Sequence, residues 1–93
     1  MKQRAFTVYD NKAECYLPPF FTPEVGQATR EFANAINSSS HAFARNPEDY
    51  TLTEVGTFDD NTGLLAALDQ PVVHGVGITY VKQQTNNPIP PQE

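Results

Sequence analysis

One segment, residues 23–36, has the pattern of an amphipathic helix and limits the folds open to this chain. Pro23 suits a first helical position, Thr22 suits an N-cap, and Glu24 meets the positive end of the helix dipole. A helix with one apolar face must cover another element of structure. We therefore predict a helix that begins at Pro23, ends near Asn37 and packs on a sheet. Its apolar positions are Val25, Ala28, Phe32, Ala35 and Ile36.

The segments on either side of this helix favour strands. Residues 5–9 and 50–58 are β-branched and aromatic, and Gly56 suggests a bulge in the second of them. Turn residues at 59–63 and apolar residues at 64–68 predict a hairpin, followed by a loop at 72–77 and a possible short strand at 78–81. The fold class is α+β: a small, mostly antiparallel sheet in the order β-α-β-β, with a possible fourth strand and one main helix packed on one face.

The length of 93 residues supports one domain with a modest core. We assign residues 1–82 to a single globular domain. Residues 83–93 are predicted to form a disordered tail, because they are rich in Pro, Gln and Asn and offer little to bury. Paired prolines favour an extended path at 17–21, and Asn46-Pro47 predicts a helical or 3₁₀ turn capped by the asparagine.

The charge balance narrows the classes of function. Six Lys and Arg against eleven Asp and Glu give a net charge of −5, which disfavours non-specific attraction to nucleic acid. Any nucleic-acid site must therefore be local. No apolar run approaches the roughly 20 residues of a membrane helix, and the N-terminus lacks the apolar region of a signal peptide. We expect no membrane contact and an intracellular protein.

Catalytic and metal sites have little support. Cys15 with His41 or His74 lacks a local signature and a third orienting group, and one cysteine with two distant histidines supplies too few ligands for zinc. Residues 59–63 place glycine one position early for a calcium loop. We expect a non-enzymatic protein with no cofactor and no metal, in which Cys15 is buried or half-buried.

Basic and aromatic residues occur close together near the start, middle and end of the chain. Such combinations hold single-stranded nucleic acid, because bases stack on rings while cations contact phosphates. The alternative is that the rings are packing residues and the cations are solvated. The candidate phosphate contacts are Arg4, Lys12, Arg30, Arg45 and Lys82, and the candidate stacking residues are Tyr9, Phe43 and Tyr80.

Phe20 and Phe21 follow two prolines and lie outside any periodic segment. They either anchor a loop to the core or remain exposed as a contact surface. In a homo-oligomer, these two residues are the first candidates for the interface.

Short motifs in a fixed order resemble the small nonstructural protein of gokushoviruses, tailless single-stranded DNA phages of the microvirus group. The match spans roughly residues 6–81. The chain has Asn46 where this family often has histidine, which argues against a role for paired loop histidines. The motifs are Tyr9-Asp10 with Lys12-Ala13, Pro19-Phe20-Phe21, His41 with Phe43, Pro47 with Asp49-Tyr50, and Gly56 with Phe58-Asp59-Asp60.

The resemblance implies a viral protein of the host bacterial cytoplasm that binds DNA and serves single-stranded genome synthesis or packaging. It implies no catalytic residue. We therefore expect a homo-oligomeric phage protein that binds single-stranded viral DNA. The alternative is an acidic adaptor that binds a viral or host protein without touching DNA, and the net charge of −5 favours it. Clustered basic residues would favour DNA, and scattered ones the adaptor.

Overall fold

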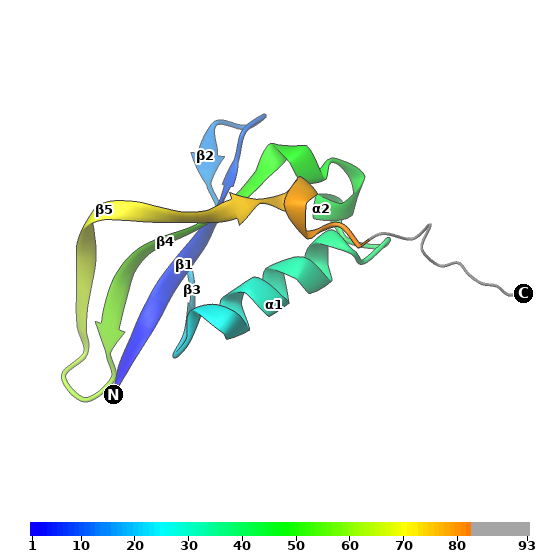
Figure 1. Cartoon of the computed structure of the whole chain (residues 1–93). Coiled ribbons are helices and arrows are strands. Elements are labelled where there is room, and N and C mark those ends of the chain that lie inside the picture. Colours follow the sequence, from blue (N-terminus) through cyan, green and yellow to red (C-terminus); the bar gives the residue numbers. More distant parts are fainter. Residues whose placement is uncertain (83–93) are drawn as a thin grey trace, which may run out of the picture.

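A computed structural model describes residues 1–82, and the predicted tail, 83–93, lies outside the described residues. The described chain forms one curled antiparallel sheet with a long helix on one side (Figure 1). The predicted α+β class is confirmed, because the strands pair in antiparallel fashion and the main helix covers one face of the sheet.

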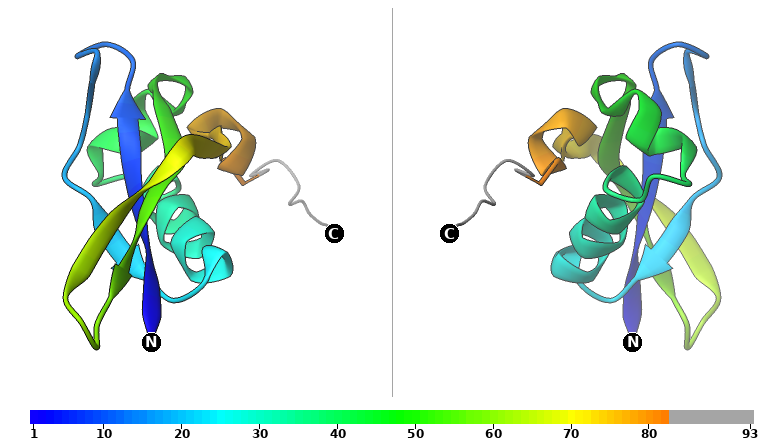
Figure 2. Two further views of the ribbon diagram at one scale, coloured as in Figure 1. Left: turned by 90° about the vertical axis from the view of Figure 1, so that its left-hand side faces the viewer. Right: turned by 90° about the vertical axis from the view of Figure 1, so that its right-hand side faces the viewer.

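The sheet has the strand order β2-β1-β4-β5, and β3 pairs with β1 on the same side as β2. Its strands are β1 (Lys2–Asp10), β2 (Cys15–Tyr16), β3 (Phe20–Thr22), β4 (Tyr50–Asp59) and β5 (Leu64–Val76). The helices are α1 (Val25–Ile36), α2 (Ala42–Arg45) and the 3₁₀ helices η1 (Pro47–Asp49) and η2 (Gly77–Tyr80). Figure 2 shows the β4–β5 hairpin curling past β1 beside the N-terminus, with the β1–β2 turn at the opposite end.

The core lies between α1 and the middle of the sheet. Because side chains alternate along a strand, Phe6 and Val8 of β1 point toward α1 while Thr7 and Tyr9 point away from it. The predicted helix face packs there, with its most buried positions at 28, 32 and 36. The buried cluster comprises Phe6, Val8, Ala28, Phe32, Ile36 and Leu52.

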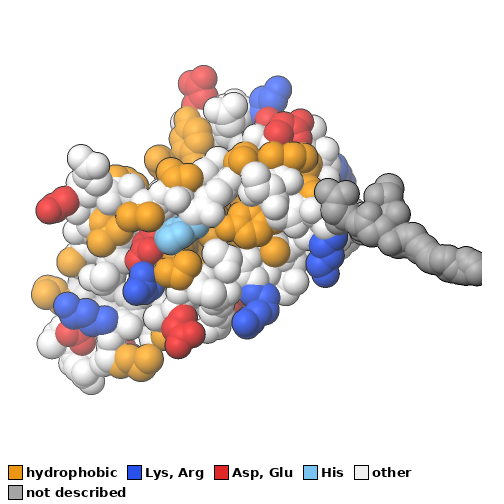
Figure 3. All heavy atoms as spheres, in the orientation of Figure 1, with side chains coloured by type: hydrophobic (Ala, Val, Ile, Leu, Met, Phe, Trp, Pro, Cys, Tyr) orange, Lys and Arg blue, Asp and Glu red, His pale blue; other side chains and the backbone are white. Residues whose placement is uncertain are grey.

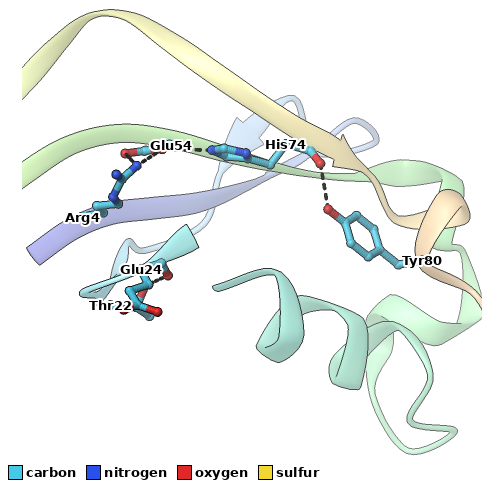
Figure 4. A network of polar contacts seen from close by, with 6 residues as sticks. All are labelled: Arg4, Thr22, Glu24, Glu54, His74 and Tyr80. Atoms are coloured by element: carbon cyan, nitrogen blue, oxygen red, sulfur yellow. Dashed lines mark hydrogen bonds and ion pairs between the residues drawn. The ribbon is translucent and has the colours of Figure 1, made fainter. Parts of the chain in front are cut away.

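Helix α1 begins at Val25, so the predicted start at Pro23 is wrong. Glu24 takes the N-cap position and makes no capping hydrogen bond through its side chain. Thr22 is not the cap either: it ends β3, is 1% exposed, and its Oγ1 donates to the Glu24 carbonyl at 2.8 Å (Figure 4). Thr22 pairs with Arg4 in the sheet, and this pairing delays the start of the helix.

Gly56 marks a bulge, as predicted. In the β1–β4 ladder Ala5 pairs with Gly56, but Phe6 pairs with Glu54, so Val55 is the extra residue. A Cβ on residue 56 would collide with the backbone carbonyl of Ala66 in β5. Glycine is therefore required at this close approach of β4 to β5, and the bulge increases the curl of the sheet.

Strand β5 is longer than predicted. It continues to Val76 instead of giving way to a loop at 72–77. Residues 68–71 lie opposite Val55 without ladder partners, and pairing resumes at Val72. Pro71 is tolerated because β5 is an edge strand of the described sheet and the proline lies in a bulge.

The prediction of a possible short strand at 78–81 is also wrong. Residues 77–80 form the 3₁₀ helix η2. The Tyr80 ring packs edge-on against Phe32 at a centroid distance of 5.3 Å, and this contact turns the chain back onto α1.

Replacing Gly56 by alanine should lower the free energy of unfolding by about 1–3 kcal/mol, because the new methyl group meets backbone of the neighbouring strand. Gly26→Ala is the matched control. A Cβ at Gly26 meets nothing within 4 Å, and alanine is favoured over glycine in a helix by up to about 1 kcal/mol. Urea unfolding followed by circular dichroism measures both variants, and equal midpoints would show that the close approach at Gly56 is unimportant.

Candidate functional site

The predicted phosphate contacts do not form one cluster. Arg4 lies toward the N-terminal end of β1, and Lys12 lies in the β1–β2 turn at the opposite end of the sheet. Arg30 belongs to α1, Arg45 ends α2, and Lys82 follows η2. All five residues are exposed. Figure 3 shows blue basic groups spaced along the visible face, with red acidic groups between them.

Packing around Phe32 brings together the three segments that carry three of the five basic residues. Phe43 of α2 and Tyr80 of η2 approach the Phe32 ring with centroid distances of 6.0 and 5.3 Å. Each of these three rings is two positions from a basic residue in the sequence. We call this group the basic end, and its members are Arg30, Arg45 and Lys82.

Side-chain hydrogen bonds fix the backbone of the basic end. Asn37, just after α1, donates from Nδ2 to the carbonyls of Ala33 and Tyr80 at 2.8 and 2.9 Å. Its Oδ1 accepts the Lys82 N–H at 2.8 Å, which ties the segment after η2 to the end of α1. At α2, His41 Nδ1 accepts the Phe43 N–H at 3.1 Å and caps the helix that carries Arg45.

Two of the three predicted stacking residues take part in this packing through their rings. Phe43 and Tyr80 are half-buried. The Phe43 ring also lies 4.4 Å from the ring of Tyr50, and the Tyr80 hydroxyl donates to the His74 carbonyl at 2.7 Å. These rings position the basic end and have little free surface for bases.

Two titratable groups have perturbed pKa values. Burial, followed by the negative charges of Asp10 and Asp49, raises the pKa of Tyr50 above its ordinary value, so this hydroxyl stays neutral at physiological pH. In the predicted turn at 59–63, the Asn61 N–H donates to Asp59 Oδ1 at 2.9 Å and lowers the pKa of Asp59. Asp59 therefore stays ionised, and the turn remains acidic.

Arg4 takes part in a polar network that no local sequence signal indicated. Its Nη1 lies 3.4 and 3.3 Å from the two carboxylate oxygens of Glu54, and His74 Nε2 lies 2.9 Å from Glu54 Oε1 (Figure 4). The Glu54 side chain is only 8% exposed, so its carboxylate depends on these partners. The three residues are far apart in the chain, and only the β1–β4–β5 pairing brings them together.

The sheet face opposite α1 has a different character, and we call it the helix-free face. The register places Gln3, Ala5, Thr7 and Tyr9 of β1 on this face. Within residues 1–82, the positions of this face that the strand pairing places hold no Lys, Arg, Asp or Glu, and Asp69 lies in the unpaired stretch of β5 beside them. The neighbouring strands contribute Tyr16, Phe21, Thr51, Thr53, Val55, Gly56, Phe58, Leu65, Ala67 and Val73.

Two aromatic pairs stand on the helix-free face. The rings of Tyr9 and Tyr16 lie 4.8 Å apart, and those of Phe21 and Phe58 lie 5.8 Å apart. Between the pairs is a pocket of about 400 Å³, whose walls include Phe21 and Leu65. Only Tyr9 and Phe21 were predicted to have a functional role, because the pairing that assembles this face joins distant segments.

The predicted interface pair is divided between the two faces. Phe20 stacks on Phe6 at a ring distance of 5.8 Å on the α1 side, while Phe21 lies on the helix-free face and is 43% exposed. Both residues belong to β3 and not to a loop.

Cys15 is exposed, so its expected burial is wrong. It lies in the two-residue strand β2, whose side chains have no cover from α1. Among residues 1–82, no group of three or more His, Cys, Asp or Glu could hold a metal ion. In the same range, no helix has the length and apolar character needed to cross a membrane.

A comparison with protein families matches residues 3–79 to the family described as phage ORF5 protein. The chain therefore belongs to the phage ORF5 protein family and is a phage protein. Neither the curated proteins nor the solved structures gave a significant match.

Substituting Arg4 by methionine should destabilise the fold by about 1–2 kcal/mol, because Glu54 loses its charge-assisted hydrogen bonds while the methionine stem preserves packing. Lys2→Met is the control, since Lys2 is an exposed cation on the same face of β1, and surface changes of this kind stay within about 0.5 kcal/mol. Thermal unfolding of both variants tests the network. If the two are equally stable, the network contributes nothing measurable to the fold.

Proposed function

We propose that this member of the phage ORF5 protein family is a non-enzymatic protein that binds single-stranded viral DNA through the basic end. The observation that carries the proposal is the packing of α1, α2 and η2 around Phe32, because these elements carry Arg30 and Arg45 and lead directly to Lys82. The resemblance to the gokushovirus nonstructural protein supports single-stranded DNA as the ligand. It also supports a role in genome synthesis or packaging in the host cytoplasm.

The basic end suits phosphates better than bases. Its cations are exposed on a hydrogen-bonded scaffold, whereas Phe43 and Tyr80 are engaged in packing. Tyr50, beside Phe43, stays neutral and adds no negative charge near the site. We therefore expect binding that depends mainly on phosphate contacts, is insensitive to base sequence and weakens steeply with salt.

The net charge of −5 limits the affinity of a single chain for DNA. Three phosphate contacts on an acidic protein give weak binding, because the rest of the surface repels the DNA backbone. Several copies along one strand would raise the effective concentration of each basic end. Homo-oligomerisation therefore fits this function.

An acidic adaptor that binds a viral or host protein is the second candidate. The separation of Arg4 and Lys12 from the basic end favours it, and so does the apolar pocket on the helix-free face. Such a face is typical of protein–protein contacts. In this case the protein would bind its partner without DNA.

A salt titration with a fluorescent single-stranded oligonucleotide tests the first proposal. Three phosphate contacts predict a slope of log affinity against log salt of about −2, since each contact on single strands contributes about −0.7. The double variant Arg45→Gln/Lys82→Gln should bind more weakly and lose about 1.4 from the magnitude of that slope.

The double variant Lys2→Gln/Lys12→Gln is the matched control, because it removes the same charge from exposed positions outside the basic end. It should keep the wild-type slope. Absence of binding at about 50 mM salt, where electrostatic contacts are strong, would refute the proposal. Equal losses in both double variants would also refute it. A reproducible protein partner that survives nuclease treatment of infected-cell extract, with no DNA affinity, would favour the adaptor.

A further inference from the structure

The helix-free face has exposed apolar side chains around a buried centre, where Ala5, Thr7 and Thr53 are only 3%, 4% and 3% exposed. Phe21, Tyr16, Leu65 and Val73 are 43%, 55%, 65% and 65% exposed, respectively. The helices α1, α2 and η2 pack on the other side of the sheet, around Phe32. Large exposed apolar patches on soluble domains usually mark a surface that another molecule covers.

We propose that this other molecule is a second copy of the chain, docked with its own helix-free face to form a two-fold dimer. The inference identifies a surface and a partner, and it does not depend on DNA binding. It assigns Phe21, Leu65, Tyr16 and Val73 to the interface and leaves the basic ends on the outer sides of the dimer.

The distribution of charge favours a second copy of the chain as the molecule that covers the helix-free face. The chain has a net charge of −5, so two copies that meet through most surfaces bring like charges together. The paired strand positions of the helix-free face in residues 1–82 hold no charged residue, so two copies can meet there with little repulsion, and exposed Asp69 lies in the unpaired stretch of β5. The nearest acid in the hairpin turn, Asp60, is already paired with the Met1 ammonium group at 2.8 Å.

The shape of the face also suits a two-fold contact. Such a contact uses the same patch on both chains, so the patch must be complementary to itself, as a patch with both protrusions and hollows can be. Phe21 and Leu65 are prominently exposed beside the pocket of about 400 Å³, which is also lined by Pro19, Val55 and Ala67. Each chain can therefore insert side chains into the hollow of the other.

The size of the face is close to that of one side of a standard interface. At about 3.3 Å per residue, a nine-residue strand such as β1 is about 30 Å long. Strands spaced about 4.8 Å apart give the order β2-β1-β4-β5 a width of about 20 Å. A curved surface of these dimensions approaches the ~800 Å² that each partner contributes to a standard interface.

The edge of the sheet is a poorer docking surface than its face. Strand β5 is irregular where residues 68–71 leave the ladder with β4. Pro71 lies in this bulge and has no N–H to donate. Bulges and prolines of this kind protect edge strands from pairing with another chain.

Two adjacent leucines provide a matched test. Leu65 lies on the helix-free face opposite Phe58, whereas Leu64 pairs with Asp59 and points to the other face. Their exposed fractions are 65% and 67%, so both tolerate a polar group in the isolated chain. Analytical ultracentrifugation of the full chain over a concentration series, for the wild type, Leu65→Glu and Leu64→Glu, measures the effect.

The wild type should sediment as a dimer that dissociates on dilution. Leu65→Glu should raise the dimer dissociation constant at least about tenfold, because the carboxylate would be buried without a partner. Leu64→Glu should leave it unchanged, and far-ultraviolet circular dichroism should show both variants folded. A wild type that is monomeric at every concentration, or equal effects of the two substitutions, would overturn the proposal. A monomer whose oligonucleotide binding is abolished by Leu65→Glu would instead assign the face to DNA bases.

Discussion

The packing of Phe43 and Tyr80 on Phe32 is the interaction on which the proposed site depends. Phe32 is 3% exposed and lies on the face of α1 that covers the sheet, so it is a core residue that also supports the elements carrying the basic end. Truncating a buried phenylalanine to alanine costs about 3–5 kcal/mol, a large share of the stability of a small domain. The position of the basic end is therefore tied to the fold itself.

The main helix covers one face of the sheet, and this gives the two sides of the molecule different chemistry. Strand β1 places Phe6 and Val8 under α1, while Thr7 and Tyr9 face the other way. Lys2 and Arg4 point to the same side as Phe6 and Val8. Strand β1 therefore contributes its cations to the helix side and none to the helix-free face. Alternation along one strand is thus sufficient to separate a charged side from an uncharged one.

The sequence predicts the parts of this structure that depend on local signals. The apolar spacing of α1, the bulge at Gly56 and the turn at 59–63 each follow from neighbouring residues, and each is present. The start of α1 was misplaced because Thr22 is used by the β1–β3 pairing. The segment after Pro71 was mistaken for a loop because only its partner strand reveals that pairing resumes.

The same distinction between local signals and contacts of distant segments applies to the site residues. Basic and aromatic residues are visible in the sequence, but whether a ring is free or packed depends on contacts between distant segments. Phe43 and Tyr80 looked equivalent to Tyr9, yet they pack around Phe32 while Tyr9 pairs with Tyr16 on the opposite side of the sheet. The Arg4–Glu54–His74 network was invisible for the same reason, since its members lie on three strands.

The central claim is that the two sides have separate roles, with DNA at the basic end and protein contact on the helix-free face. Titration of a short thymidine oligonucleotide into isotope-labelled protein, followed by amide and methyl chemical shifts, tests this claim most directly. The account predicts shift changes around Arg30, Arg45 and Lys82, with the methyl groups of Leu65 unaffected. Changes centred on Tyr16, Phe21 and Leu65, with none at the basic end, would contradict it.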